Sequence, residues 1–407
     1  MAGPLLGIRV LDLSRILAGP WCTQALADLG AEVIKVERPG VGDDTRSWGP
    51  PFVRRPDGSE TSDSAYFMAT NRGKRSITVD IARPEGQAII HQLVRRCDVV
   101  IENYKFGDMQ RYALDYASLA AINPAIVYCS ITGFGQTGPY RERAGYDFMI
   151  QGMGGLMSVT GERDDLPGGG PQKAGVPIAD MMTGMYSSLA IVGALYERRT
   201  SGQGQHIDMA LLDTQVSWLA NQNLNYLVSG EVPRRWGNAH PNLAPYQAFA
   251  TADGNLILAI GNDGQFRRFC QCAGLDAIPE DPRFVDNRAR LANRQALVEI
   301  VARALAQRTT AQWMQALERI GVPCGPINTI DQVFADPQVR ERGLRRDLPH
   351  PQAGTVPSVA SPIRYSRTAI EYDRAPPLLG EHTGEVLAGL LGLDGAQIAA
   401  LRADGII

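Results

Sequence analysis

The sequence predicts an α/β fold, and three observations support this prediction. Within residues 8–131, short apolar segments alternate with segments whose apolar residues recur at helical spacing. The short segments show little polar alternation, which is typical of strands buried on both faces of a parallel sheet covered by helices. The chain has 407 residues, more than the roughly 250–300 at which a single core stops growing. We therefore expect two domains, or one domain with a large insertion.

The first part of the chain supplies the strands of the predicted sheet. Each is rich in β-branched residues or leucine, and turn residues separate it from the next helix. The predicted strands are Ile8–Leu11, Val33–Val36, Ser76–Asp80, Val99–Glu102 and Ala125–Ile131, and the helices predicted between them are Pro20–Leu29 and Pro84–Arg95.

From Asp180 onward the pattern changes to long helices and then to a smaller α+β region. Long helices are predicted over Asp180–Tyr196 and Leu211–Val228. The α+β region comprises a strand at Leu256–Ile260 and helices at Gln265–Cys272, Arg294–Gln307 and Ala311–Ile320; a proline-rich segment, Pro351–Pro377, precedes a last helix at Glu385–Leu391.

The composition limits the class of protein. The net charge of −3 and the isoelectric point near 6.0 argue against a protein that coats nucleic acid or an anionic membrane. Met1–Gly7 lacks the features of a signal peptide, and polar residues interrupt the longest apolar stretch, Met181–Tyr196. The six cysteines form no Cys-x-x-Cys pair, so we expect reduced thiols and no metal site. These features predict a soluble, cytoplasmic protein.

Two common classes of enzyme lack their motifs here. The first β-α turn keeps only Gly19 of the three glycines that let a backbone approach a pyrophosphate, and Trp21 occupies the space needed. Glu37 stands where a ribose-binding acid would be, but it does not compensate for the missing glycines. No serine or cysteine lies in a nucleophile motif with a histidine partner, which disfavours a triad hydrolase.

Asp180 is the candidate catalytic residue, with two compatible interpretations. It stands at the start of a long apolar helix, shortly after three glycines. As an N-cap, its carboxylate would accept backbone N–H bonds and complement the helix dipole. As a functional group, it would be a carboxylate in a mostly apolar pocket, where desolvation makes it a better nucleophile.

Polar and basic residues recur at the ends of the predicted strands. They are Arg15 after the first strand, Arg38 after the second, Lys74 with Arg75 before the third, and Asn103, Tyr104 and Arg111 after the fourth. Ligands of open parallel sheets bind outside the carboxyl ends of strands. Each residue alone fits a solvated surface charge, but together they suit a phosphorylated ligand.

These features together resemble the class III CoA-transferase family, which includes formyl-CoA transferase, carnitine CoA-transferase and α-methylacyl-CoA racemase. The resemblance runs from about Leu5 to His382. It is carried, in order, by Val10–Pro20, Gly30–Pro39, Asn71–Ile77, Val100–Asn103, Gly133–Pro139, Ala179-Asp180, Gly202–Gln205 and Gly380–Thr383.

The resemblance implies a covalent mechanism centred on Asp180. The carboxylate would attack the donor thioester to give an acyl-aspartyl anhydride and CoA thiolate, and the thiolate would then form an aspartyl-CoA thioester. The acceptor acid would reverse the sequence and leave as its CoA ester, with no tightly bound cofactor and no metal. The CoA contacts that the resemblance implies are Arg15, Ala18, Arg38, Lys74, Asn103, Tyr104, Arg111 and Tyr146.

The family's racemases suggest an alternative reaction. Their histidine lies in a Gly-His-Asp motif, which here reads Gly145-Tyr146-Asp147. A tyrosine, with an ordinary pKa of about 10, is a poor base at neutral pH, so transfer is favoured over racemisation. An acyl-CoA racemase and a non-catalytic acyl-CoA binder remain the alternatives.

Other departures and likenesses bear on the substrate. Leu17 replaces the glutamine of formyl-CoA transferase, and Asn262 and Asp263 interrupt its glycine-rich loop, represented by Ile260–Gln265. The segment Gly237–Gln247 resembles members that use succinyl-CoA and dicarboxylates. We expect a succinyl-CoA donor and a dicarboxylate acceptor, whose distal carboxylate would pair with Arg141, Arg143 or His240.

The family resemblance also implies the architecture. A Rossmann-like large domain would be built from both chain ends, with a smaller α+β domain inserted in the middle. We expect residues 1–225 and 329–407 in the large domain, 226–328 in the small one, and an interlocked homodimer.

Overall fold

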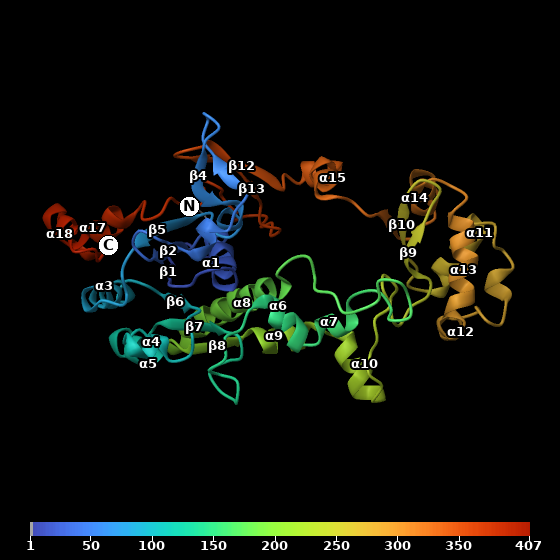
Figure 1. Cartoon of the computed structure of the whole chain (residues 1–407), viewed down its shortest axis with the longest axis horizontal. Helices are drawn as coiled ribbons and strands as arrows, with labels where there is room; N and C mark the ends of the chain where they lie inside the picture. The colour runs from blue at the N-terminus through green and yellow to red at the C-terminus, as the bar shows by residue number, and fades with distance from the viewer. Residues whose placement is uncertain (1–2) are drawn as a thin grey trace. The chain divides into compact units, whose positions relative to one another are not determined.

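The computed structural model of the protein describes residues 3–407, which form two compact units (Figure 1). The first unit comprises Met1–Leu156, Ala174–Leu224 and Gln338–Ile407, and the second comprises Met157–Lys173 and Asn225–Pro337. The second unit therefore exceeds the expected insertion, 226–328, at both ends. Arg235 accounts for the additional loop, because its guanidinium donates to the carbonyl oxygens of Ser158 and Glu162 and pairs with Asp164.

The first unit is built on a parallel sheet, as the sequence predicts, but the sheet has six strands, one more than the five predicted. Across the sheet, the strands are β5 (Lys74–Thr78), β2 (Glu32–Glu37), β1 (Arg9–Asp12), β6 (Val99–Glu102), β7 (Val127–Thr132) and β8 (His206–Ala210). Val10 faces one core and Leu11 the other, and both are fully buried. This burial on both faces confirms the interpretation of the strands and the α/β fold class.

Helices cover both faces of this sheet. One face packs against α3 (Pro84–Val94), α5 (Tyr116–Ile122), α17 (Thr383–Leu391) and α18 (Gly395–Ala403). The opposite face packs against α1 (Ala18–Asp28), α6 (Asp147–Met153), α8 (Ile178–Ser201) and α9 (Leu211–Trp218). Helices from the two ends of the chain thus share one core in the first unit.

The first unit also contains three short helices and two hairpins. The helices are η1 (Asp44–Ser47), α2 (Ala65–Met68) and α4 (Asp108–Arg111). One hairpin pairs β3 (Phe52–Arg54) with β4 (Glu60–Ser64), and the other pairs β12 (Arg345–His350) with β13 (Gly354–Val359). Phe67 and Leu348 pack in one small core. The returning C-terminal segment is also tied to β5, because the Thr78 amide donates to the Thr383 hydroxyl at 3.0 Å.

The second unit is an α+β structure with its own core. A three-stranded antiparallel sheet contains β11 (Cys324–Pro326), β10 (Asn255–Ala259) and β9 (Tyr246–Ala250). The helices are α11 (Asp263–Cys272), η2 (Ile278–Glu280), α12 (Asn287–Ala292), α13 (Arg294–Leu305), α14 (Thr310–Arg319) and α15 (Ile330–Ala335). Trp313 and Leu317 of α14 are buried in this core, as their spacing predicts, and a Thr309–Gln312 capping box begins the helix. Three further helices lie where the chain passes between units: α7 (Leu156–Val159), α10 (Asn221–Ser229) and α16 (Pro337–Glu341).

The prediction of one continuous helix over Leu211–Val228 is wrong. The chain forms α9 and α10 instead, because Ala220 adopts a left-handed conformation with φ +50°. The Asn223 side-chain amide donates to the Val216 carbonyl at 2.5 Å. A side-chain donor thus takes an acceptor that the continued helix would have used.

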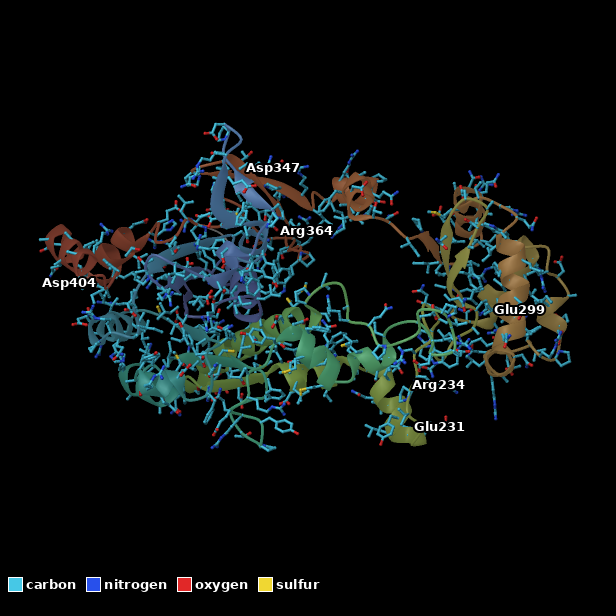
Figure 2. All side chains as sticks on the ribbon, in the orientation of Figure 1. Glu231, Arg234, Glu299, Asp347, Arg364 and Asp404 are labelled. Carbon is cyan, nitrogen blue, oxygen red and sulfur yellow. The ribbon has the colours of Figure 1, made fainter. Side chains whose placement is uncertain are left out.

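The long helix α8 is the one described helix that is apolar and long enough to cross a membrane, by length and composition only. Its Ile191, Ala194 and Leu195 pack against the sheet. Charged side chains of both signs project from the outside of each unit, among them Asp404 and Arg364 in the first and Glu299 and Arg234 in the second (Figure 2). The six cysteines are free thiols, as expected.

Candidate active site

Asp180 lies in the first turn of α8, and its carboxylate is not held by another side chain or backbone group of the described residues. The side chain is partly buried and, within residues 3–407, makes no hydrogen bond or ion pair. Burial raises the pKa of Asp180 to about 7 from its ordinary value of 3.8, and the charge of Asp147 adds to the shift. A carboxylate with a raised pKa and free oxygens is a stronger base and nucleophile than a hydrated one.

The N-cap interpretation of Asp180 is wrong. Pro177 occupies the N-cap position, and Asp180 already has helical backbone geometry. The carboxylate that accepts the first amides of α8 belongs to Asp147 at the start of α6: Oδ1 accepts from the amides of Ala179 at 2.8 Å and Asp180 at 3.3 Å. Gln151 donates to Oδ2 at 2.6 Å. Because Asp147 performs this role, the Asp180 carboxylate stays available for chemistry.

A close approach of α8 to α1 sets the position of Asp180. A methyl group at Gly184 would lie 2.6 Å from the Ala18 carbonyl oxygen, which is too close for any side chain. Asp180 precedes Gly184 by four residues and so lies one turn earlier on the same face of the helix. Its carboxylate therefore lies towards the N-terminus of α1 and the segment that connects β1 to α1.

Aromatic side chains form part of the surroundings of Asp180. Burial raises the pKa of Tyr66, and the negative charges of Asp180 and Asp147 add to the shift. Trp48 packs edge-on against Tyr66, with ring centroids 5.2 Å apart. Tyr66 and Trp48 were not predicted from the sequence, and Asp147 entered only as the residue after Tyr146. No local motif in the sequence marks Trp48 or Tyr66, and both are far from Asp180 in the chain.

Three of the predicted CoA contacts come together at the carboxyl ends of β1 and β6. The Arg15 amide donates to Asn103 Oδ1 at 2.9 Å, and Asn103 Nδ2 donates to the Arg15 carbonyl at 2.6 Å. The Arg15 guanidinium lies 5.5 Å from the centroid of the Tyr104 ring and pairs with Asp44 at 3.2 Å. This cluster offers an exposed cation beside an aromatic face, which suits a phosphate and a planar group.

Lys74 does not belong to this accessible cluster. Its ammonium is fully buried and donates to Asp12 at 3.2 Å, to the Pro20 carbonyl at 3.0 Å and to Asn71 at 2.9 Å. Burial lowers the pKa of Lys74 to about 8, although Asp12 opposes this shift. All three N–H donors are used inside the protein, so we withdraw Lys74 from the predicted CoA contacts.

The remaining predicted contacts are spread around the same edge of the first unit. Arg38 is exposed just after β2, and Ala18 is buried at the start of α1. Arg111 of α4 is exposed, pairs with Asp108 at 3.3 Å and donates to the Tyr112 hydroxyl at 2.8 Å. Tyr146, directly before α6, has 63% of its surface exposed.

The connection between β1 and α1 carries backbone strain. Ile16 adopts φ +73°, a left-handed conformation that is a genuine outlier for a β-branched residue. Such a conformation costs on the order of 1–3 kcal/mol and persists only where surrounding contacts hold it. Gly19, by contrast, is a packing glycine, since a methyl group there would lie 2.2 Å from the Ser14 hydroxyl oxygen.

The candidates for the distal carboxylate of the acceptor lie on different units. Arg141 and Arg143 are in the loop after β7, where they stack on Phe106 at 4.8 Å and on Tyr140 at 4.5 Å. His240 belongs to the second unit, where its Nδ1 accepts from the Asn242 amide at 3.0 Å. Residues 3–407 contain no group of three or more His, Cys, Asp or Glu side chains that could hold a metal ion.

Comparison with known proteins defines the class. Residues 5–383 match the model of CoA-transferase family III. The chain belongs to this family, as the order of its motifs indicates.

Individual relatives have narrower names. The chain is 55% identical over 387 residues to a succinate–glutarate CoA-transferase of Agrobacterium fabrum, covering 95% of this chain and 96% of that protein. It is 44% identical over 404 residues to a succinyl-CoA:glutarate CoA-transferase of Mus musculus, covering 99% and 90% of the two chains. A crystal structure of a CAIB/BAIF family protein from Brucella suis superimposes with a TM-score of 0.84 at 52% identity, covering 96% of this chain and 100% of that one.

Proposed function

We propose that this protein transfers CoA from succinyl-CoA to a dicarboxylic acid of the size of glutarate. The Asp180 carboxylate, which makes no hydrogen bond or ion pair in residues 3–407 and has its pKa raised to about 7, is the observation that carries the proposal. The names of the relatives support the choice of donor and acceptor.

Asp180 acts as the nucleophile in the proposed mechanism. A carboxylate oxygen attacks the thioester carbonyl, and the C–S bond breaks to give an acyl-aspartyl anhydride and CoA thiolate. The thiolate then attacks the aspartyl carbonyl and releases the donor acid. The acceptor carboxylate attacks the resulting aspartyl-CoA thioester, and the returning thiolate takes the acceptor acyl group and frees Asp180.

The cluster of Arg15, Asn103 and Tyr104, together with Arg38 and Arg111, is proposed to hold the CoA nucleotide. Arginine forms bidentate contacts with phosphate, and Tyr104 offers an aromatic face. Ala18 and Tyr146 are proposed to line the path to Asp180. Arg141 and Arg143, both exposed, are the proposed partners of the acceptor's second carboxylate.

The direct test is exchange between succinyl-CoA and a panel of mono- and dicarboxylic acids, with the CoA esters separated by mass spectrometry. Glutaryl-CoA or a similar dicarboxylic ester should form in proportion to the succinate released. A protein that exchanges no pair would not be the proposed transferase. Incorporation of deuterium at the α-carbon of an acyl-CoA without an acceptor acid would support a racemase instead.

The pH dependence of transfer should report the titration of Asp180. Only the ionised carboxylate attacks, so kcat/KM should fall about tenfold per pH unit below the pKa near 7. Asp147→Asn removes one of the two causes of the raised pKa, and its amide oxygen can still accept from Ala179. The acidic limb should therefore move to lower pH, whereas Asp404→Asn on the outside of the same unit should leave it in place. A profile that is flat between pH 6 and 8 would contradict this assignment.

We also propose that the protein is a homodimer, with the interlocked arrangement of its family. An exposed apolar row along α8, formed by Met185, Leu189 and Tyr196, supports this, because such surface favours burial against another chain. Sedimentation equilibrium should give about twice the chain mass of 44.1 kDa. Leu189→Asp should shift the protein towards the monomer, while Glu197→Asp on the same helix should not; a wild-type mass of one chain would disprove the dimer.

A further inference from the structure

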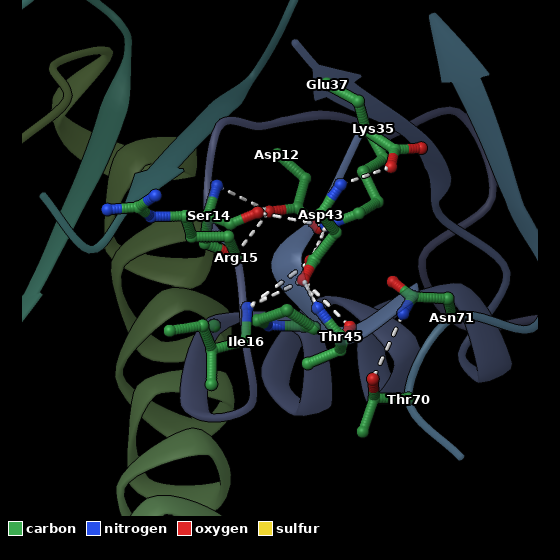
Figure 3. Close-up of polar contacts among 12 residues, drawn as sticks. Asp12, Ser14, Arg15, Ile16, Lys35, Glu37, Asp43, Thr45, Thr70 and Asn71 are labelled. Carbon is green, nitrogen blue, oxygen red and sulfur yellow. Dashed lines mark hydrogen bonds and ion pairs between the residues drawn. The ribbon is translucent and has the colours of Figure 1, made fainter. Parts of the chain in front are cut away.

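Side chains from elsewhere in the first unit bind backbone amides and carbonyls of three consecutive residues, 14–16, in the connection between β1 and α1 (Figure 3). The Ser14 amide donates to Asp12 at 3.0 Å, and the Ser14 carbonyl accepts from Lys35 Nζ at 3.0 Å. Asn103 holds both the amide and the carbonyl of Arg15. The Ile16 amide then donates to both carboxylate oxygens of Asp43, at 3.2 and 3.3 Å.

Asp43 is itself fixed on several sides. Lys35 pairs with its Oδ2 at 2.8 Å, and neither side chain is exposed to solvent. Thr45 donates to its Oδ1 from the amide at 3.0 Å and from the hydroxyl at 2.7 Å. The Asp43 amide donates to Glu37 at 2.9 Å. Because Asp43 makes this many contacts, its carboxylate would stay in place if the connection between β1 and α1 changed conformation.

The amide that donates to this fixed carboxylate belongs to the strained residue, Ile16. Ile16, with its left-handed φ of +73°, stands between Arg15 and the first turn of α1, towards which Asp180 is directed. Relaxing φ to a negative value would turn the Ile16 amide away from Asp43. The chain would then carry Arg15 and the start of α1 into a different position.

We propose that Asp43 is a positioning residue, which holds Ile16 in its left-handed conformation so that Arg15 and the start of α1 face the reacting thioester. The inference rests on the proposed function, in that the thioester is the group positioned. A buried ion pair is seldom the most stabilising choice for a protein interior, since apolar residues of similar size are often as stable. Stability alone does not explain why Lys35 and Asp43 are buried as an ion pair, whereas the need to hold a strained loop does.

The test compares two double variants that both remove the buried ion pair. Lys35→Met with Asp43→Asn keeps an oxygen that can accept from the Ile16 amide, whereas Lys35→Met with Asp43→Leu has no acceptor. We expect the asparagine variant to keep kcat within about fivefold of the wild type and the leucine variant to lose on the order of 50-fold, as displaced catalytic geometry does. KM for the thioester should change less than kcat.

Glycine at position 16 should restore what the leucine variant loses. Glycine adopts a positive φ without steric strain, so adding Ile16→Gly should recover about tenfold in kcat. A general loss of packing would not respond in this way. Equal kcat values for the asparagine and leucine variants, or no recovery with glycine, would overturn the proposal.

Two structural measurements keep the inference separate from the proposed function. Hydrogen exchange of the peptide spanning residues 13–18 should be slow in the wild type and the asparagine variant and fast in the leucine variant. In the wild-type background, Ile16→Gly should melt above Ile16→Ala, the reverse of the usual order, because only alanine is strained at φ +73°. This second comparison decides the role of the strain even if the leucine variant does not fold.

These measurements need no substrate. If the wild type transferred CoA between no pair of acids, the proposed function would fail. The positioning role itself would be refuted by unchanged hydrogen exchange in the leucine variant, or by a melting temperature of Ile16→Gly below that of Ile16→Ala.

Discussion

Replacing Asp180 with alanine is expected to lower the rate of CoA transfer at least ~10⁴-fold, because the residue that carries the acyl group and then CoA is lost. CoA binding should change little. The cluster proposed to hold the nucleotide lies at the ends of β1 and β6, and Asp180 makes no hydrogen bond to it. Isothermal titration with CoA, beside the exchange assay, separates the two effects.

The same substitution should stabilise the fold at pH 8. The pKa of Asp180 is about 7 in the folded chain and 3.8 ordinarily, so ionisation opposes folding. The penalty is complete above pH 7, shrinks as the pH falls towards 4, and vanishes below that value. At pH 8, Asp180→Ala should raise the free energy of unfolding by on the order of 2 kcal/mol. Urea melts at pH 8 and pH 4 should show this gain only at the higher pH.

A matched control and a chemical test complete this prediction. Asp404→Ala, exposed on the same unit, should change neither transfer nor stability. Hydroxylamine should modify Asp180 of the wild type only when an acyl-CoA is present. Appreciable transfer by Asp180→Ala, or a loss of stability at pH 8, would mean that the carboxylate is structural.

The sequence predicted the frame of this site because its signals are local. Apolar runs between turns identify strands buried on both faces, and the ends of parallel strands meet at one edge. Arg15 and Asn103 are 88 residues apart, yet each lies within three residues of the end of a strand, β1 or β6, so their proximity was predictable. Asp180 stood out at the start of a long apolar helix, and the family resemblance made it the catalytic candidate. Its place in the sequence suggested an N-cap, but that role belongs to Asp147.

The burial of charged residues could not be predicted in the same way. Lys74 and Arg15 both stand beside strand ends in the sequence, but Lys74 is fully buried and Arg15 is exposed. The difference depends on partners that are distant in the chain: Asp12 lies 62 residues from Lys74 and supplies the charge that permits burial. A single sequence gives no indication of such pairs, and the same reason hides Asp147, which takes over the cap of α8.

Another buried network joins distant parts of the chain, and Arg46 is its centre. Its guanidinium donates to both oxygens of Glu37, at 2.8 and 2.7 Å, and to Asp63 at 2.6 Å. It also donates to the Pro377 carbonyl at 3.1 Å and lies 3.7 Å above the Phe67 ring. All four partners of Arg46 are buried.

Arg46→Met should therefore lower the free energy of unfolding by about 3–5 kcal/mol, since two buried carboxylates lose their partner. Although burial opposes it, Arg46 holds the pKa of Glu37 below its ordinary value of 4.5. Its stabilising effect is present above pH 4.5 and is lost as the pH falls through the lowered value. The two proteins should thus differ most near pH 7 and converge below pH 4, where protonation removes the unpaired charges. Arg54→Met, which breaks an exposed ion pair with Glu60, should change stability by less than about 0.5 kcal/mol at either pH. If the two variants proved equally stable in urea at pH 7, the buried network would not be what joins the ends of the chain.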